Sequence, residues 1–157
     1  MAVINCFSKN KIISSLKTVI LIALLIFLAT LIEIYWAMGT FSEKISSGCL
    51  DCLFIEDAFF ISLLTTIFLT IVFILISFIK NIYIKVVLEL IFLISVWFFW
   101  NYNIFVDRES SWSTYAFNEE LYYTFSFSIF PILVLSVITV FFINYISKKY
   151  EHKYSVL

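Results

Sequence analysis

Turn-forming residues are nearly absent from this sequence of 157 residues. It contains two glycines and one proline, and charged residues make up only 13% of it. A soluble domain carries about 25% charged residues, so the chain has too little polar surface to coat a water-soluble globule. An all-β fold is excluded as well, because its many tight turns require glycine and proline.

Residues for catalysis are equally scarce. The chain has one histidine, His152, and it lacks a glycine-rich phosphate loop, a nucleophile elbow and a His-Glu-x-x-His motif. Most hydrolytic and metal-dependent chemistries therefore have no residues to use, and a zinc site would need about four ligands. Nucleic-acid binding would need more than the short basic flanks of this chain. We expect no catalytic residue, no metal or cofactor, and no nucleic-acid partner.

Long apolar runs are what the sequence has instead. Hydrophobic residues make up 63% of the chain, and a helix needs about 20 apolar residues to cross a bilayer. Four stretches are long enough: 18–38, 59–79, 82–100 and 121–146. They predict an all-α, polytopic membrane protein whose four transmembrane helices form one bundle and one domain, 1–157. The first stretch is longer than the roughly 7–15 residues of a signal-peptide core, so we expect a retained helix.

Basic residues predict how the four helices are oriented, because positively charged flanks stay on the cytoplasmic side. Most of them flank the two termini and the short connection at 80–81. They are Lys9, Lys11, Lys17, Lys80, Lys85, Lys148, Lys149 and Lys153. Only Lys44 and Arg108 lie in the other two loops, 39–58 and 101–120. We therefore expect both termini inside and these two loops outside, in a bacterial inner membrane.

The two outer loops are strongly acidic. Eight acidic residues against two basic ones leave six net negative charges. The acids are Glu43, Asp51, Glu56, Asp57, Asp107, Glu109, Glu119 and Glu120. A field of one sign steers association with a partner of opposite charge, so these side chains are candidate partner-binding residues. Alternatively, the acids simply fill loops on the side that basic residues avoid.

One acidic residue lies within the first predicted span. At a rise of 1.5 Å per residue, Glu33 is about 22 Å into the membrane, and intramembrane carboxylates are functional candidates by default. Small multidrug transporters also carry a glutamate in the first of four spans, although this chain lacks their glycine-rich packing motifs. Glu33 is thus a candidate site of a small oligomeric transporter or channel. Alternatively, it simply reaches the interface beside Tyr35 and Trp36.

Two cysteines, Cys49 and Cys52, form a C-x-x-C motif in the first outer loop. Such thiols are often reactive, and a disulfide forms in an oxidising compartment. Four spans with this motif in the first outer loop resemble the quinone-coupled disulfide oxidases of the DsbB type. That family has a second cysteine pair in the second outer loop and an arginine shortly after the first pair, and this chain has neither. We expect a structural disulfide or two idle thiols, with a redox role as the alternative.

Polar and aromatic residues inside the spans predict how the helices pack. Small polar residues, which let helices approach closely, recur on one face of spans two and four. They are Ser62, Thr66, Thr70, Ser77, Ser128, Ser136 and Asn144. Glu89 follows Lys85 by four residues, which predicts an ion pair, and Pro131 is expected to kink the fourth helix. Aromatic rings favour the headgroup level, so Trp97 and Trp100 are predicted to anchor the third span there.

These features favour recognition over catalysis. We expect a non-enzymatic membrane protein that binds another membrane or membrane-inserting protein, in the bilayer or at its outer face. One form is an immunity-type protein that blocks a pore-forming toxin or bacteriocin, by analogy of size and layout alone. The other form is an accessory subunit of a larger membrane complex.

Overall fold

Four long helices make up most of this protein. The computed structural model describes residues 2–155, and the side chains of residues 16–149. The helices are α1 (Ala2–Met38), α2 (Phe54–Ile76), α3 (Ile82–Arg108) and α4 (Phe117–Ser155). Two 3-10 helices, η1 (Gly39–Phe41) and η2 (Ser110–Trp112), follow α1 and α3. The side chains of Lys9, Lys11, His152 and Lys153, which entered the sequence analysis, lie outside the described residues.

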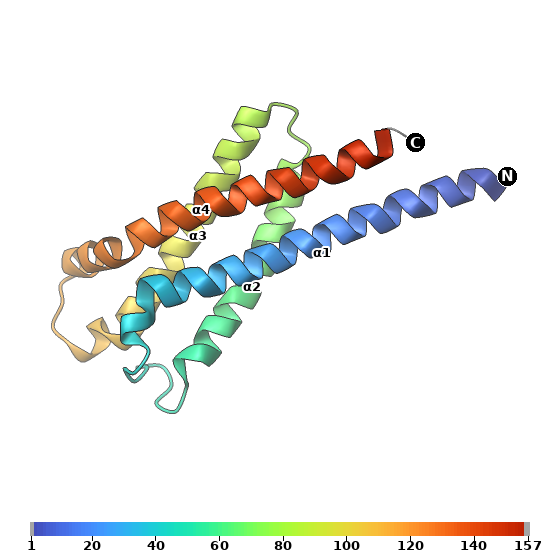
Figure 1. The fold of residues 1–157 in the computed structure, drawn as a ribbon. Helices are drawn as coiled ribbons and strands as arrows, with labels where there is room; N and C mark the ends of the chain where they lie inside the picture. Colours follow the sequence, from blue (N-terminus) through green and yellow to red (C-terminus); the bar gives the residue numbers. More distant parts are fainter. Residues whose placement is uncertain (1, 156–157) are drawn as a thin grey trace.

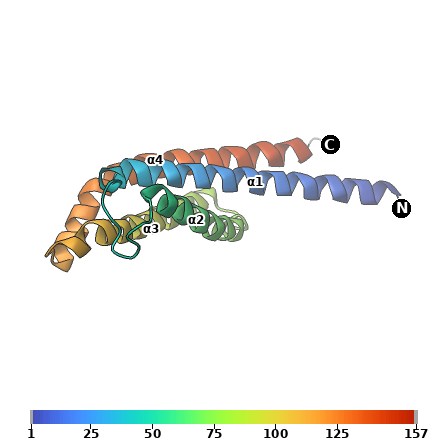
Figure 2. The same ribbon diagram turned by 90° about the horizontal axis from the view of Figure 1, so that it is seen from below.

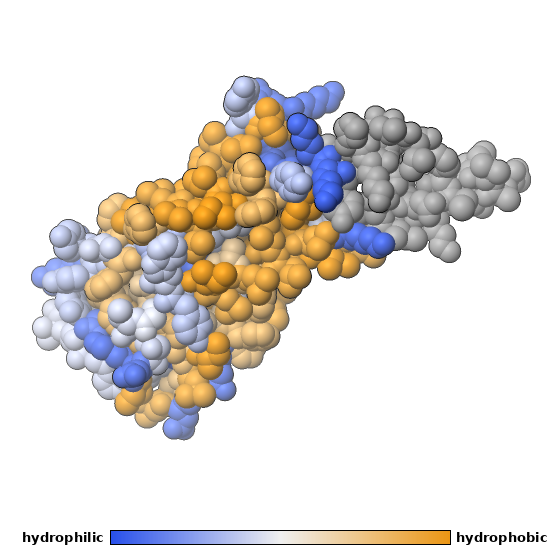
Figure 3. All heavy atoms as spheres, in the orientation of Figure 1, coloured by the Kyte–Doolittle hydropathy of each residue, from blue (hydrophilic) through white to orange (hydrophobic). Residues whose placement is uncertain are grey.

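All four helices are long and apolar enough to cross a membrane. The fold is 84% helical, without strands in the described chain. The candidate spans are Leu16–Phe41, Phe54–Ile76, Ile82–Trp112 and Phe117–Lys149. Figure 3 shows apolar side chains over the middle of the molecule and polar side chains toward its ends. The chain is therefore a multi-pass membrane protein with four helices in one bundle, as predicted.

The helices begin where polar groups cap their first backbone N–H groups. Asn81 Oδ1 accepts hydrogen bonds from the second and third residues of α3, at 3.0 and 3.4 Å. Glu56 accepts from the backbone N–H of Leu53 at 3.2 Å, just before α2. Glu119 accepts from that of Ala116 at 2.9 Å, just before α4. With these caps, α2 and α4 begin several residues before the apolar runs predicted at 59–79 and 121–146.

The layout places two different kinds of connection at opposite ends of the bundle. The short turn 77–81 between α2 and α3 lies toward the end that holds both termini (Figure 1). The two longer connections, 39–53 and 109–116, lie together at the other end, which we call the outer end. Helices α1 and α4 run antiparallel, side by side, in both views (Figures 1 and 2). This arrangement agrees with the predicted layout, while the sidedness stays a prediction.

The third helix turns one stripe of residues toward the core. Its buried residues recur every three or four positions, with one adjacent pair at 104 and 105: Glu89, Leu93, Trp97, Asn101, Ile104, Phe105 and Arg108. The prediction that Trp97 anchors at the interface is wrong, because this residue is 0% exposed. Its indole Nε1 donates to Thr30 Oγ1 on α1 at 3.0 Å. A tryptophan at the end of an apolar run can face either the headgroups or the core, and the helical register puts Trp97 in the core.

The small polar residues of α2 and α4 mostly bond within their own helices. Ser62 donates to the carbonyl of Ala58 and Ser128 to that of Thr124, both at 2.7 Å. Ser62 and Ser128 are buried, so they permit close packing without themselves bridging two helices. Figure 2 shows α4 bent between its first third and the remainder, in agreement with the kink predicted for Pro131 in this helix.

Candidate functional site

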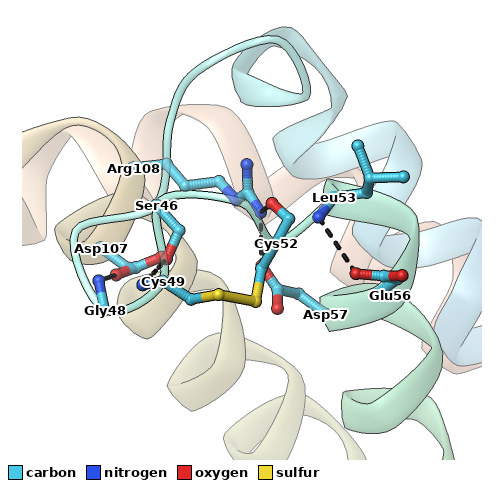
Figure 4. Close-up of a disulfide and its surroundings, with 9 residues drawn as sticks. All are labelled: Ser46, Gly48, Cys49, Cys52, Leu53, Glu56, Asp57, Asp107 and Arg108. Atoms are coloured by element: carbon cyan, nitrogen blue, oxygen red, sulfur yellow. Dashed lines mark hydrogen bonds and ion pairs between the residues drawn. A yellow bond between two sulfur atoms is a disulfide. The ribbon is translucent and has the colours of Figure 1, made fainter.

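Arg108 holds the outer end of the bundle together. This last residue of α3 is 2% exposed, and its guanidinium pairs with the carboxylate of Asp57 on α2. It also donates to the backbone carbonyls of Lys44 at 2.5 Å and Cys52 at 3.4 Å. The guanidinium carbon lies 5.2 Å from the ring centroid of Phe54. One side chain therefore attaches two separate points of the first long connection to α3. Figure 4 shows Arg108 beside Cys52 and Asp57.

The neighbouring Asp107 organises the turn that precedes the cysteines. Its Oδ1 accepts hydrogen bonds from Ser47 Oγ at 2.8 Å and from the backbone N–H of Gly48 at 3.0 Å. Its backbone carbonyl accepts from the Ser47 N–H at 3.1 Å. The next N–H, that of Cys49, donates to Ser46 Oγ at 3.1 Å. Two adjacent residues of α3 thus hold successive parts of the same connection (Figure 4).

Cys49 and Cys52 form a disulfide within this connection, with Cα atoms 5.4 Å apart. The Cys52 N–H also donates to the Cys49 carbonyl at 3.3 Å, so the bridge encloses a tight turn. The contacts of Arg108 and Asp107 flank this turn on both sides. The disulfide therefore restrains the connection 39–53 together with the hydrogen bonds from Arg108 and to Asp107.

Replacing Cys52 by serine is expected to lower the free energy of unfolding by roughly 2 kcal/mol, the chain-entropy value for so short a loop. Chemical denaturation of the purified protein in detergent would measure it. Reduction of the wild-type protein should lower stability by the same amount and leave the double variant Cys49→Ser/Cys52→Ser unchanged. If reduction leaves the wild-type protein unchanged, the disulfide does not restrain the loop.

The second long connection is attached to the first. Trp112 Nε1 donates to the backbone carbonyl of Ile45 at 2.9 Å, and Lys44 pairs with Glu109. We call the joined residues 39–57 and 107–120 the outer cap. Farther along, Glu120 at the start of α4 accepts hydrogen bonds from Ser110 and from the Tyr102 hydroxyl, the latter at 2.8 Å. The outer cap is therefore one connected unit rather than two independent loops.

The eight predicted partner-binding acids fall into two groups of four. The half-buried ones bond within the bundle's outer end: Asp57, Asp107, Glu109 and Glu120. The exposed ones are Glu43, Asp51, Glu56 and Glu119. Glu56 and Glu119 cap helices, as described above, while Glu43 and Asp51 form no hydrogen bond or ion pair with other described residues. The sequence had no signal for this division, because it depends on where Arg108 and Lys44 lie in space.

The surface of the outer cap combines charge with exposed apolar side chains. Two cations against eight acids leave it six negative charges. Leu50 is 69% exposed, Leu53 62%, and Ile45 and Trp112 57% each. A groove runs between the two connections and is lined by Glu43, Lys44, Ile45, Arg108, Glu109, Trp112 and Ser113. Acidic and apolar groups therefore lie close together on this surface.

A second candidate site lies inside the bundle. Glu33 on α1 is 0% exposed, and its Oε1 accepts a hydrogen bond from Asn101 Nδ2 on α3 at 2.7 Å. Glu33 Oε2 and Asn101 Oδ1 have no hydrogen-bond partner. The interpretation that Glu33 reaches the interface is wrong, because its face of α1 is turned into the bundle. Asn101 was not among the predicted site residues, because the predicted third span ended at residue 100, whereas α3 continues to Arg108.

Glu89 occupies the opposite half of the bundle. Its Oε1 lies 4.0 Å from Lys85 Nζ, which confirms the predicted ion pair. Its Oε2 accepts from Asn144 Nδ2 on α4 at 2.6 Å, a contact between helices that the sequence did not predict. The described part of the bundle thus contains two glutamate–asparagine pairs, and of these two the pair at Glu89 has a cation, Lys85, beside it.

Comparisons with protein-family models, with curated proteins and with solved structures find no match for this chain. No group of three or more His, Cys, Asp or Glu side chains able to hold a metal ion occurs among the described residues. The outer cap and the buried pair at Glu33 are therefore the two candidate sites among the described residues.

Proposed function

We propose that this chain is a non-enzymatic membrane protein that binds another protein through its outer cap. The partner that fits is a membrane or membrane-inserting protein that presents basic and apolar side chains. The observation that carries the proposal is the construction of the cap. Arg108 and its neighbours hold two connections together, while four acids and several large apolar side chains stay exposed on them.

Rigidity of the cap supports this proposal. A flexible loop must be ordered when it binds, and that ordering reduces affinity. Here the contacts of Arg108, Asp107 and Trp112 order the connections in advance. Several charged groups bond to one another within the cap. Acids still outnumber cations there by eight to two, so the ordered surface stays negatively charged.

Charge and apolar exposure support the proposal further. A surface with six net negative charges attracts a basic partner and speeds its encounter. Exposed apolar side chains gathered on one surface are typical of interaction sites, and Leu50 and Leu53 flank the acidic Asp51 and the disulfide. An immunity-type protein that neutralises a membrane-inserting toxin would use such a surface in a bacterial inner membrane. An accessory subunit of a membrane complex would use it equally well.

The thiol–disulfide alternative has less support. Cys49 and Cys52 are joined to one another, and the chain has no second cysteine pair in 101–120 to pass oxidation to a partner. The bridge also lies among contacts that stabilise the loop. We therefore propose a structural role for this disulfide.

Reversing the charge of Glu43 and Asp51 is expected to weaken partner binding about tenfold, which is roughly 1.4 kcal/mol, and to leave the fold intact. Neither side chain forms a hydrogen bond or ion pair with another described residue that would be lost. A photoreactive residue at Leu50 in the full-length protein in cells would report binding as a discrete crosslinked adduct. The double variant Glu43→Lys/Asp51→Lys should lose this adduct, and the adduct should weaken in high salt.

The same photoreactive residue at Phe78 serves as the matched control. Phe78 is 78% exposed but lies in the turn between α2 and α3, far from the outer cap, and should not give that adduct. Absence of an adduct at Leu50, or an adduct that the charge reversal leaves unchanged, would contradict binding through the acidic cap.

A further inference from the structure

The buried pair of Glu33 and Asn101 has two unpartnered oxygens in two residues that already touch. Asn101 Nδ2 donates to Glu33 Oε1 at 2.7 Å, while Glu33 Oε2 and Asn101 Oδ1 are buried without a partner. Buried polar atoms are almost always hydrogen-bonded, and an unpaired carboxylate oxygen inside a membrane bundle is especially costly. Glu33 Oε2 and Asn101 Oδ1 therefore both need a hydrogen-bond partner.

A single proton placed between these two oxygens would give each of them a hydrogen bond. We propose that Glu33 binds a proton, and that the protonated carboxyl forms a closed acid–amide pair with Asn101. Carboxyl and carboxamide groups are both planar and present one donor beside one acceptor. The Asn101 amide donates to Oε1, and a proton on Oε2 donates back to Oδ1. The proton comes from water and leaves Glu33 uncharged, so no co-reactant is required.

No cation among the residues whose side chains the structure describes is in place to neutralise Glu33 instead. The only polar contact of this carboxyl group among the described residues is Asn101. Most described charged groups of the helices packed on α1 bond to other residues, while Lys148 and Lys149 of α4 follow Asn144, which contacts Glu89 in the opposite half of the bundle. Asp57 of α2 pairs with Arg108 of α3. Two more acids of α3 are bonded, Glu89 to Lys85 and Asp107 to Ser47. Glu120 of α4 accepts a hydrogen bond from Ser110. On α1 itself, Lys17 lies more than four helical turns before Glu33.

The second glutamate–asparagine pair provides an internal comparison. Glu89 combines an asparagine with a lysine, and its two oxygens face Asn144 and Lys85. The unpartnered buried atoms include no oxygen of Glu89 or Asn144. In both pairs an asparagine donates to one carboxylate oxygen of a glutamate. The second oxygen of Glu89 faces the cation Lys85, and in the proposal the second oxygen of Glu33 carries a proton. This proposal is independent of partner binding at the outer cap.

Infrared spectroscopy of the full-length protein in lipid nanodiscs tests the proposal. Glutamate labelled with carbon-13 identifies the carbonyl stretch of a protonated glutamic acid. At neutral pH the wild-type protein should show this band, Glu33→Gln should lose it, and Glu89→Gln should keep it. Asn101→Leu should retain the band at a higher frequency, because the hydrogen bonds to Asn101 are gone. Circular dichroism would establish that each variant is folded.

Stability against pH gives a second readout, which does not require Asn101→Leu to fold. The protonated state is the one that satisfies the folded bundle, so its contribution is lost as the pH rises through the range in which Glu33 ionises. The melting temperature of the wild-type protein should fall at alkaline pH more than that of Glu33→Gln, which mimics the neutral acid. Absence of the band in wild-type protein, its persistence in folded Glu33→Gln, or parallel pH profiles would each overturn the proposal.

Discussion

Replacement of Arg108 by alanine is expected to lower the free energy of unfolding by about 3 kcal/mol, the lower end of the range for breaking a buried ion pair. The loss includes the pair with Asp57 and the hydrogen bonds to the carbonyls of Lys44 and Cys52. The lower end applies because the Asp57 side chain is 34% exposed, so water partly replaces the guanidinium. Denaturant titration in detergent, followed by circular dichroism, would measure the loss.

Lys44→Ala is the matched control for Arg108. Lys44 also carries an ion pair, with Glu109, but its side chain is 47% exposed, so its removal should cost about 0–1 kcal/mol. Arg108→Lys should recover only part of the loss, because a single ammonium group lacks the planar fork that reaches three acceptors. Equal, small losses in all three variants would show that Arg108 does not hold the outer cap together.

Replacement of Trp97 by alanine is expected to cost about 3–5 kcal/mol, since truncating a buried aromatic side chain leaves a cavity. Trp97 is 0% exposed and packs among Ile26, Leu69 and Ile132 in the core. Trp97→Phe removes the hydrogen bond to Thr30, worth about 0.6 kcal/mol between membrane helices, together with part of the buried ring volume. We therefore expect a loss between that value and the loss in Trp97→Ala. The same denaturant titration would measure both variants.

Phe99→Ala provides the control for Trp97. Phe99 is two residues farther along α3 and 56% exposed, so its truncation should change stability by no more than about 0.5 kcal/mol. If Phe99→Ala costs as much as Trp97→Ala, the two faces of α3 are not divided between core and lipid as described.

The variants separate two properties of the outer cap. Arg108→Ala removes the contacts that order the cap but leaves the exposed acids Glu43 and Asp51 in place. Glu43→Lys/Asp51→Lys reverses those charges but leaves the contacts of Arg108 intact. If binding depends on the presentation of a preformed surface, both changes weaken the crosslink at Leu50. Loss of stability should accompany only the first of them.

The sequence by itself determined the class of this protein and the order of its parts. Apolar runs longer than a bilayer's requirement predicted four helices, and the scarcity of glycine and proline excluded other folds. Span positions also predicted a short turn at 80–81, which the structure has at 77–81, and acidic loops that share one end of the bundle. These are local properties, because each depends on the composition of a continuous stretch of chain.

Only the tertiary structure decided which side chains meet. In a water-soluble helix the polar face marks the outside, but a helix in a bilayer is apolar toward both lipid and core. The sequence therefore could not assign Trp97 to the core, and it could not pair Glu33 with Asn101, which lies 68 residues farther along the chain. It likewise counted Arg108 as one of two loop cations. Its burial against Asp57 and Cys52 depends on three segments meeting in space, which no local pattern encodes.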